Sequence, residues 1–464
     1  MHLWRFNLHK TNAVNEELAI SLFNGREVQE RRRYPIAPSL YSLSNKMDNS
    51  LLAVRDINHK YIVVGVRCGM KKMLMIYPNN FLQGAMGTNN RVTQLVSIFK
   101  EIGYEIDYFS FENFSPDSTF KDFEKQNAQG IIHELFLYDF QAGYGGEGKT
   151  DTKLHHFCER VKRRLIREKK KQFLQDWVPL GAQRMFTDIL AKHDYDVIIT
   201  FYTYLATLFQ NREIKAKKVY FMEDSMFLQQ YAWEKDTVEG VSLGKLLDEE
   251  LERMQCFDEV FCISNDERIF YEKATGRDMN FLPHLMPQEA KQSEIPVEKR
   301  RWDVFFIGFN NPFNVAGLEW FLEKVYPLLD KNMKILLVGS ATKNIEVKYK
   351  NVEIIPFAPD LDEIYANVKI TICPMFKGTG MKVKVVEAMA KGIPVVCNER
   401  GVDGLPDKNM CGCLVTQDAE EFAAYINRLV SDSDFYDDMA KRISQYYRQV
   451  FDREKYVKML RKRL

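Results

Sequence analysis

A glycine turn between a predicted strand and a predicted helix constrains the fold of this chain more than any other feature. Residues 374–396 read as the end of a buried strand, a turn, a helix and a further buried strand. Gly378 and Gly380 lie in the turn, and the helix runs from about Lys382 to Lys391. Glycine has no Cβ, so the backbone N–H groups of such a turn can approach a ligand closely. The free N–H groups at the start of the helix point back at the same turn.

The charges around this turn suit a nucleotide. Lys382 and Lys384 add positive charge at the helix start, and Glu387, one turn further on, can accept hydrogen bonds from a ribose. A P-loop is excluded because Gly-Lys-Ser/Thr is absent, and Val383 occupies the place of the third glycine of a dinucleotide fingerprint. The alternative is an ordinary strand–turn–helix unit in which Glu387 pairs with Lys391. Both interpretations remain open on local chemistry alone.

Composition describes a globular chain with no bulk attraction to a charged partner. The 464 residues suffice for two or more domains, and 45% hydrophobic and 28% charged residues exclude a disordered chain. A net charge of +1 excludes a general pull toward nucleic acid, so we expect no nucleic-acid partner. No apolar run approaches the ~18 residues of a membrane span, and the first residues lack the pattern of a signal peptide.

The eight cysteines contain no Cys-x-x-Cys pair. Cys411 and Cys413 offer only two ligands, and the spacing of His155, His156 and Cys158 fits no standard metal site. We therefore expect no metal and no cofactor, and a reduced, cytoplasmic protein.

The turn resembles a known donor site. Gly378, Gly380, Lys382, Lys384, Glu387 and Ala388 follow the pattern Gly-x-Gly-x-Lys-x-Lys-x-x-Glu-Ala position by position. This pattern is similar to the signature of one branch of the retaining glycosyltransferases of family four, which depend on nucleotide sugars. Residues 305–322 resemble the first strand, loop and helix of the nucleotide domain in that branch, and residues 335–339 resemble its second strand. The resemblance is strong over about residues 300–464 and weaker over about 70–295.

The resemblance implies an α/β chain with the GT-B fold, in which two Rossmann-like, doubly wound domains face each other across a cleft. We assign residues 1–69 to an extension of unclear role, 70–295 to the acceptor domain and 296–450 to the nucleotide-sugar donor domain. Residues 451–464 are expected to form a helix that crosses back to the first domain. Alternating strand and helix signals agree with this organisation. In the second domain we expect strands at residues 304–308, 335–338, 352–355, 370–373 and 394–397, and a helix at 315–325.

The resemblance also implies the site residues. Donor binding is assigned to Gly84, Gly87, Gly308, Asn310, Asn311, Gly378, Thr379, Gly380, Lys382, Lys384 and Glu387. Many family members carry a glutamate that contacts the donor sugar at the position of Thr379, so this contact must come from Thr379, from backbone or from elsewhere. The Asn310–Asn311 turn has a purely structural alternative, with Asn314 as the cap of the next helix.

Two residues are assigned to catalysis. Negative charge builds on the leaving phosphate, and Lys382 is the first candidate to stabilise it. Residues two apart on a helix face different ways, so we expect Lys384 to meet solvent or Glu387 instead. Asp224 follows a predicted strand and is a candidate for orienting substrate hydroxyls, with the capping of the next helix as the alternative. A lone histidine, His284, is interpreted as structural.

The sequence therefore predicts a retaining glycosyltransferase of the hexosyltransferase type that uses a nucleoside diphosphate sugar and acts on a surface glycan or glycolipid. One rival is a nucleotide-sugar epimerase or hydrolase on the same fold, and another is a non-catalytic binding protein. The basic segment Arg160–Lys171 suits a peripheral contact with the inner face of the cell membrane, or alternatively a solvated helix. The segment Gly143–Gly148 is a candidate lip over the acceptor site.

Overall fold

The structure is a computed structural model of the chain. It describes side chains at residues 70–83, 88–115, 118–140, 174–286, 293–343, 345, 349–358 and 360–464, the backbone of 51–55, 61–65 and 87, and a few positions between 153 and 161. The chain divides into two compact units, Met1–Met70 and Lys71–Leu464. In the first unit, β1 (Leu51–Arg55) pairs antiparallel with β2 (Tyr61–Gly65). The division falls next to residue 70, where the sequence predicts that the extension ends and the acceptor domain begins.

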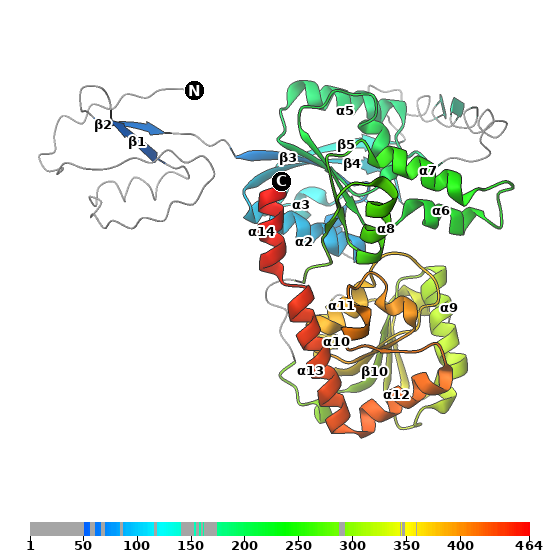
Figure 1. Ribbon diagram of the computed structural model, residues 1–464. Coiled ribbons are helices and arrows are strands. Elements are labelled where there is room, and N and C mark those ends of the chain that lie inside the picture. The colour runs from blue at the N-terminus through cyan, green and yellow to red at the C-terminus, as the bar shows by residue number, and fades with distance from the viewer. Residues whose placement is uncertain are drawn as a thin grey trace, which may run out of the picture. The chain divides into compact units, whose positions relative to one another are not determined.

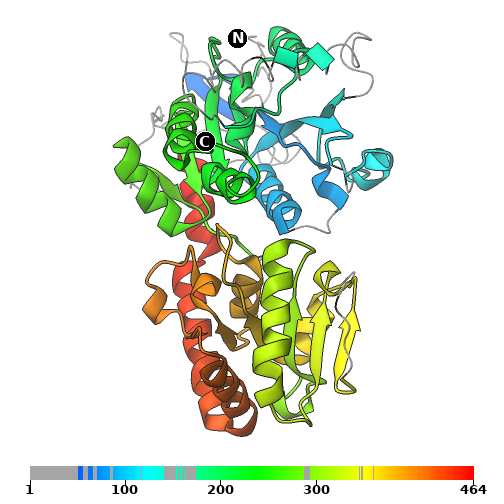
Figure 2. The same cartoon turned by 90° about the vertical axis from the view of Figure 1, so that its right-hand side faces the viewer.

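The first domain of the second unit is built on a seven-stranded parallel sheet with the order β5-β4-β3-β6-β7-β8-β9 (Figures 1 and 2). Its strands are β3 (Lys71–Ile76), β4 (Tyr104–Glu112), β5 (Glu134–Asp139), β6 (Val197–Thr200), β7 (Lys217–Met222), β8 (Glu259–Cys262) and β9 (Asn280–Phe281). The helices that accompany it are α2 (Gly87–Glu101), α3 (Phe123–Gln126), α5 (Leu180–Lys192), α6 (Met226–Glu234), α7 (Leu243–Met254) and α8 (Asn265–Thr275).

The second domain repeats this plan with a six-stranded parallel sheet of order β12-β11-β10-β13-β14-β15. Its strands are β10 (Trp302–Ile307), β11 (Ile335–Val338), β12 (Val352–Ile355), β13 (Val368–Cys373), β14 (Val395–Cys397) and β15 (Leu414–Val415). Its helices are α9 (Pro312–Trp320), which continues as a π-turn at Phe321–Val325, then α10 (Asp362–Ala366), α11 (Val383–Ala390), α12 (Ala419–Ser431) and α13 (Ser433–Val450).

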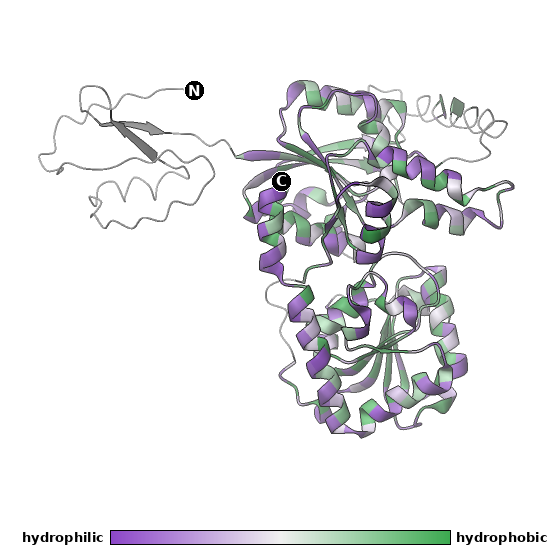
Figure 3. Ribbon diagram, in the orientation of Figure 1, coloured by the Kyte–Doolittle hydropathy of each residue, from purple (hydrophilic) through white to green (hydrophobic). Residues whose placement is uncertain are grey.

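Buried apolar strands hold each sheet in its place. All residues of β6 and β11 are buried, which is typical of parallel strands covered by helices on both faces. The central strands carry apolar residues, whereas the helices carry both apolar and polar ones (Figure 3). Each sheet packs against a separate apolar cluster on either face, so each domain has its own core.

The last helix, α14 (Arg453–Arg463), packs on the first domain although it follows the second in the sequence (Figure 1). Its apolar side chains Tyr456, Val457 and Leu460 are buried in the cluster that includes α2 and β3. Arg453 forms a 2.6 Å ion pair with Glu101 at the end of α2. The preceding helix, α13, buries its apolar face in the second domain instead. The chain end therefore ties the two domains together.

The strand order places the candidate site. In both sheets the order reverses beside the first strand, between β3 and β6 and between β10 and β13. Ligands of doubly wound sheets bind at the carboxyl ends of the strands at such a reversal. The turn with Gly378 follows β13, and the Asn310–Asn311 turn follows β10. Among the described residues, helices of the length and apolarity that a bilayer span requires are absent.

Candidate functional site

The glycine turn after β13 adopts a backbone that requires glycine. Gly378 has φ of 122° and Gly380 has φ of 67°, in the left-handed region that side chains disfavour. A Cβ on Gly380 would lie 2.7 Å from Asp224 Oδ1 and 2.9 Å from the carbonyl oxygen of Glu223. The turn is therefore in close contact with the first domain at Gly380.

Lys382 is buried directly beneath this turn. It stands at the N-cap of α11, and its amine donates hydrogen bonds to the carbonyl oxygens of Thr379 and Gly380, each at 3.0 Å. A Cβ on Gly378 would lie 3.8 Å from Lys382 Nζ. The amine thus places a full positive charge against the turn and also fixes its backbone.

Lys384 has a different environment from the one that the sequence analysis expects. Its amine donates to Asn314 Oδ1 at 2.8 Å and lies 4.9 Å from the centre of the Phe306 ring. Burial lowers its pKa, while the nearby charge of Glu387 acts in the opposite direction. The expectation of a hydrogen bond to solvent or Glu387 is corrected, because α9 supplies a neutral acceptor directly opposite. Lys384 therefore joins the helices that follow β10 and β13.

Glu387 is held by Tyr365, whose hydroxyl donates to Oε2 at 2.9 Å. Burial raises the pKa of Glu387 to about 7, against the lowering effect of this hydrogen bond and of Lys384. The alternative i,i+4 ion pair with Lys391 is wrong, because Lys391 pairs with Asp362 at 2.6 Å. Glu387 is partly exposed and is close to half-ionised at neutral pH.

The turn after β10 lies beside the glycine turn and is fixed by side-chain hydrogen bonds. Asn310 N donates to Ser340 Oγ at 2.8 Å. Asn311, not Asn314, caps α9: its Oδ1 accepts from Phe313 N at 3.0 Å and from Asn314 N at 2.8 Å. The helix starts three residues earlier than expected because Pro312 is favourable in its first turn. Asn314 is thereby free to face Lys384.

Gly308 and Gly317 allow close packing around this turn. A Cβ on Gly308 would lie 2.9 Å from the Phe306 ring, and a Cβ on Gly317 would lie 2.0 Å from the carbonyl oxygen of Pro374. Helix α9 therefore lies directly against the start of the glycine turn. Gly308, Asn310 and Asn311 belong to the site as scaffold, through backbone and capping bonds.

The first domain presents two acidic residues at the end of β7. Glu223 is buried and forms a 2.7 Å ion pair with Arg91, whose side chain also donates to the carbonyl oxygens of Leu282 and Pro283. Asp224 accepts a 2.9 Å hydrogen bond from the hydroxyl of Thr379. Burial raises the pKa of both carboxyls, against the lowering effects of these partners.

The capping alternative for Asp224 is not what the structure shows, because Ser225 occupies the N-cap of α6. Asp224 instead contacts the turn of the second domain. Thr379, which stands where the resemblance places a glutamate, therefore bonds to an acidic residue that the other domain supplies.

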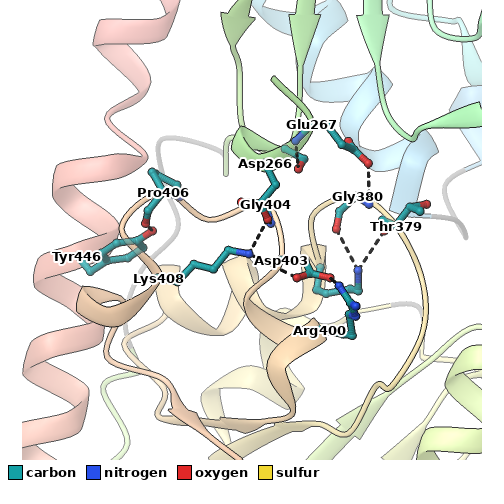
Figure 4. A network of polar contacts seen from close by, with 12 residues as sticks. Asp266, Glu267, Thr379, Gly380, Arg400, Asp403, Gly404, Pro406, Lys408 and Tyr446 are labelled. Carbon is teal, nitrogen blue, oxygen red and sulfur yellow. Dashed lines mark hydrogen bonds and ion pairs between the residues drawn. The ribbon is translucent and has the colours of Figure 1, made fainter. Parts of the chain in front are cut away.

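A third acidic residue, Glu267, was not identified from the sequence. It lies in the first turn of α8 and accepts a 3.2 Å hydrogen bond from Gly380 N (Figure 4). The spacing Ser264-x-x-Glu267 is typical of a helix start. This local role is enough to explain a glutamate at position 267, so the sequence does not indicate a contact with the second domain. Burial raises the pKa of Glu267 to about 8.

A second polar contact between the domains lies beside the first (Figure 4). Asp266 Oδ2 accepts from Lys408 Nζ at 2.5 Å and from Gly404 N at 2.9 Å. Asn265 N donates to Gly404 O at 2.9 Å. The start of α8 thus touches the second domain at Gly380 and at Gly404.

Most of the remaining candidates have no described position. Gly84, Gly143–Gly148 and nearly all of Arg160–Lys171 are outside the described residues, and Gly87 is the first residue of α2. His284 is fully buried near Arg91, and burial lowers its pKa to about 3, so it is neutral and fits a structural role.

One group of three potential metal ligands, Asp107, Glu134 and His193, occurs among the described residues. The carboxylate of Asp107 already accepts bonds from Tyr195 and His133, each at 2.8 Å. Internal partners account for this carboxylate, and it carries no metal assignment.

Comparison with solved structures shows the fold class. Anabaena HepE, solved in complex with UDP and glucose, matches with a TM-score of 0.57 at 14% identity, covering 85% of this chain and 98% of that one. A sucrose-phosphate synthase from Thermosynechococcus elongatus matches with a TM-score of 0.57 at 16% identity, covering 84% and 97%. The predicted fold is confirmed: this is the GT-B arrangement of two Rossmann-like domains.

Sequence comparison identifies the second domain. Residues 301–432 match the family described as "Glycosyl transferases group 1", so this part of the chain is a domain of that family. An uncharacterized 44.6 kDa protein from the cps region of Klebsiella pneumoniae is 28% identical over 185 residues. That alignment covers 37% of this chain and 46% of the relative, so it spans about half of the relative's length.

Proposed function

We propose that this protein transfers a sugar from a nucleoside diphosphate sugar to a glycan or glycolipid acceptor, with retention of configuration at the anomeric carbon. One observation carries the proposal: the glycine turn of Gly378–Gly380 lies at the strand-order reversal of a glycosyl transferases group 1 domain, with the Lys382 amine against its backbone. Among similar structures, HepE was solved in complex with UDP and glucose, and TarM from S. aureus in complex with UDP and α-GlcNAc-glycerol.

The proposed chemistry divides between the two domains. Lys382 and the N–H groups at the start of α11 stabilise the charge that builds on the leaving diphosphate. Glu387, when ionised, accepts hydrogen bonds from the ribose hydroxyls. Asp224, already bonded to Thr379, orients hydroxyls of the donor sugar or the acceptor. The leaving phosphate helps to remove the acceptor proton, so the proposal requires no side-chain nucleophile and no metal.

Binding is tested first with a thermal-shift panel of UDP, GDP, ADP, CMP and their sugar conjugates. A ligand at about 100 times its dissociation constant adds about 2.7 kcal/mol of stability, which such a measurement detects. We expect one nucleoside diphosphate to stand out. A flat panel at millimolar ligand would contradict the proposal.

Lys382→Ala tests the site within the same panel. Loss of a charge-assisted hydrogen bond costs roughly 1.5–3 kcal/mol, so affinity should fall roughly tenfold to a hundredfold. Each variant is compared with its own ligand-free form, because the Lys382 amine also supports the turn. Lys391→Ala is the matched control, since Lys391 is on the same helix and pairs with Asp362. Equal affinity in all three proteins would place the diphosphate elsewhere.

Turnover separates transfer from its rivals. With the nucleotide identified, the labelled donor is incubated with and without glycan or glycolipid acceptors, and the anomeric configuration of the product is read by NMR. Sugar release without an acceptor would favour a hydrolase, and an altered sugar an epimerase. Binding without turnover on any acceptor would favour a non-catalytic protein. A cytoplasmic location, with a peripheral contact to the inner membrane face, is part of the same proposal.

A further inference from the structure

Glu267 is a buried carboxyl of the first domain that reaches the glycine turn of Gly378–Gly380 in the second domain. Its Oε1 accepts from Gly380 N at 3.2 Å. Its Oε2 is buried and accepts no hydrogen bond of ordinary geometry from any described residue, although the Ser225 hydroxyl is close enough to lower the pKa. A buried carboxylate with so few donors is costly when ionised. The protonated form is the one that this environment favours.

Besides burial, one titratable neighbour, Asp224, favours the protonated form of Glu267. Asp224, from the turn after β7, faces it with a like charge, whereas Lys382, from the start of α11, opposes that effect. Cys262 at the end of β8, Tyr220 on β7 and Tyr271 on α8 also lie within electrostatic reach, and each is neutral at physiological pH because burial raises its pKa.

The charged neighbours of Glu267 on its own helix have other partners. Asp266 pairs with Lys408 at 2.5 Å, and Arg268 pairs with Glu272 at 2.7 Å. Lys382 is therefore the cation that acts on Glu267 most directly among the described residues, and its amine bonds to the carbonyl oxygens of Thr379 and Gly380.

We propose that Glu267 is a positioning residue that must carry a proton for the turn to accept a diphosphate. The proposal rests on the proposed function of this turn. In the neutral form, one oxygen holds the Gly380 N–H while the other contributes an O–H group rather than a negative charge. Donor binding is then coupled to the protonation of a residue from the opposite domain.

The coupling follows from charge. A diphosphate brings at least two negative charges to a turn that already faces Asp224, and a charge on Glu267 would add repulsion in a poorly screened environment. Because the anion favours the protonated carboxyl, it raises the pKa of Glu267 above its value of about 8 in the free protein. Above that pH, binding must take up a proton.

The test is a calorimetric titration with pyrophosphate and with UDP. Between about pH 7 and pH 9 the protonated fraction of a group with a pKa of about 8 falls about tenfold, so affinity of the native protein should fall by about that factor. Glu267→Gln keeps the size and neutrality of the protonated side chain, so its affinity should lose the tenfold fall that the titration of Glu267 causes. Glu319→Gln, exposed on α9, is the matched control and should fall like the native protein. Titration of the ligand itself is common to all three.

A second measurement needs no variant. At about pH 9 the heat of binding, measured in two buffers of different ionisation enthalpy, should reveal uptake of about one proton by the native protein. An unchanged proton balance, or a Glu267→Gln variant whose affinity falls with pH as in the native protein, would overturn the proposal. Equal weakening of that variant at both pH values would show a merely structural role and also overturn it. Absence of binding by the native protein at every pH would instead refute the proposed function.

Discussion

The two domains place groups of opposite charge at their contact around Gly380. The first domain presents carboxyl groups: Glu223 and Asp224 at the end of β7, and Glu267 at the start of α8. The second domain presents glycine backbone with the Lys382 amine behind it. An anion is therefore attracted by the second domain and repelled by the first wherever these carboxyls are ionised. In the proposed function, the domain that matches the glycosyltransferase family supplies the charge that binds the diphosphate, and the carboxyls of the other domain influence binding through their protonation state.

The largest effect on stability is expected from removing Arg91, the cation that pairs with Glu223 in the first domain. Arg91 is 1% exposed, pairs with Glu223 at 2.7 Å and donates to two carbonyl oxygens. Arg91→Ala leaves a buried carboxyl without its cation, which costs about 3–5 kcal/mol of unfolding free energy. Chemical denaturation followed by circular dichroism measures this loss.

Two further variants define the cause of that loss. Arg91→Ala combined with Glu223→Gln should recover a part of it, because the uncompensated charge is then removed. Arg268→Ala removes a more exposed ion pair, with side chains 24% and 29% exposed, and should cost less than about 1 kcal/mol. If Arg91→Ala lowered the unfolding free energy no more than Arg268→Ala, the buried ion pair of Arg91 and Glu223 would not be what stabilises the first domain here.

Glu387, in the second domain, should give ligand affinity a pH dependence of opposite sign to the one that Glu267 of the first domain gives. Ionised Glu387 accepts hydrogen bonds from ribose hydroxyls, and its pKa is about 7. Between about pH 6 and pH 8 its ionised fraction rises about tenfold, so UDP affinity should strengthen by up to that factor. Glu387→Gln should remove this gain for UDP. Pyrophosphate, which has no ribose, should respond alike in both proteins, and a gain for UDP that persists in the variant would remove Glu387 from the ribose site.

Local pattern predicted the second domain well. The strands at Ile335–Val338 and Val352–Ile355 are found at the expected residues, because short apolar runs between turn signals leave little choice in a parallel sheet. Helix starts were harder to place. The cap of α9 lies at Asn311 and not at Asn314, since both asparagines suit a cap and only the packing of Asn314 against Lys384 separates them.

Residues that act between the domains could not be predicted. Asp224 was identified because it ends a strand, but its partner Thr379 is 155 positions away in the sequence. Glu267 satisfies a helix-start pattern, so nothing local indicates that its carboxyl reaches Gly380. Arg91 is a charged residue in the second turn of α2, where a solvent-exposed side chain would be expected, yet its side chain is among the most buried. Contacts of this kind depend on how two domains meet, which no periodicity encodes.

The smallest effect is expected at the second contact between the domains. Lys408 and Asp266 form a 2.5 Å ion pair whose side chains are 35% and 45% exposed. Exposed pairs contribute about 0.2–1 kcal/mol and are screened by salt. A double-mutant cycle of Lys408→Ala and Asp266→Ala, measured by chemical denaturation, should give a coupling free energy in that range, and it should shrink when the ionic strength rises from about 0.05 M to 0.5 M.

A second double-mutant cycle, on Asp224 and Thr379, compares this exposed pair with the hydrogen bond between those two residues. Asp224→Ala and Thr379→Val each remove the hydrogen bond from the Thr379 hydroxyl to a partly buried carboxyl, so their coupling should be the larger of the two and should change little with salt. A salt-independent coupling above about 2 kcal/mol for Lys408 and Asp266 would contradict this ranking. The contact of Asp266 with Lys408 and Gly404 would then contribute more to the association of the domains than the contact at Gly380. The contact at Gly380 could then change with ligand binding and protonation at little cost in stability.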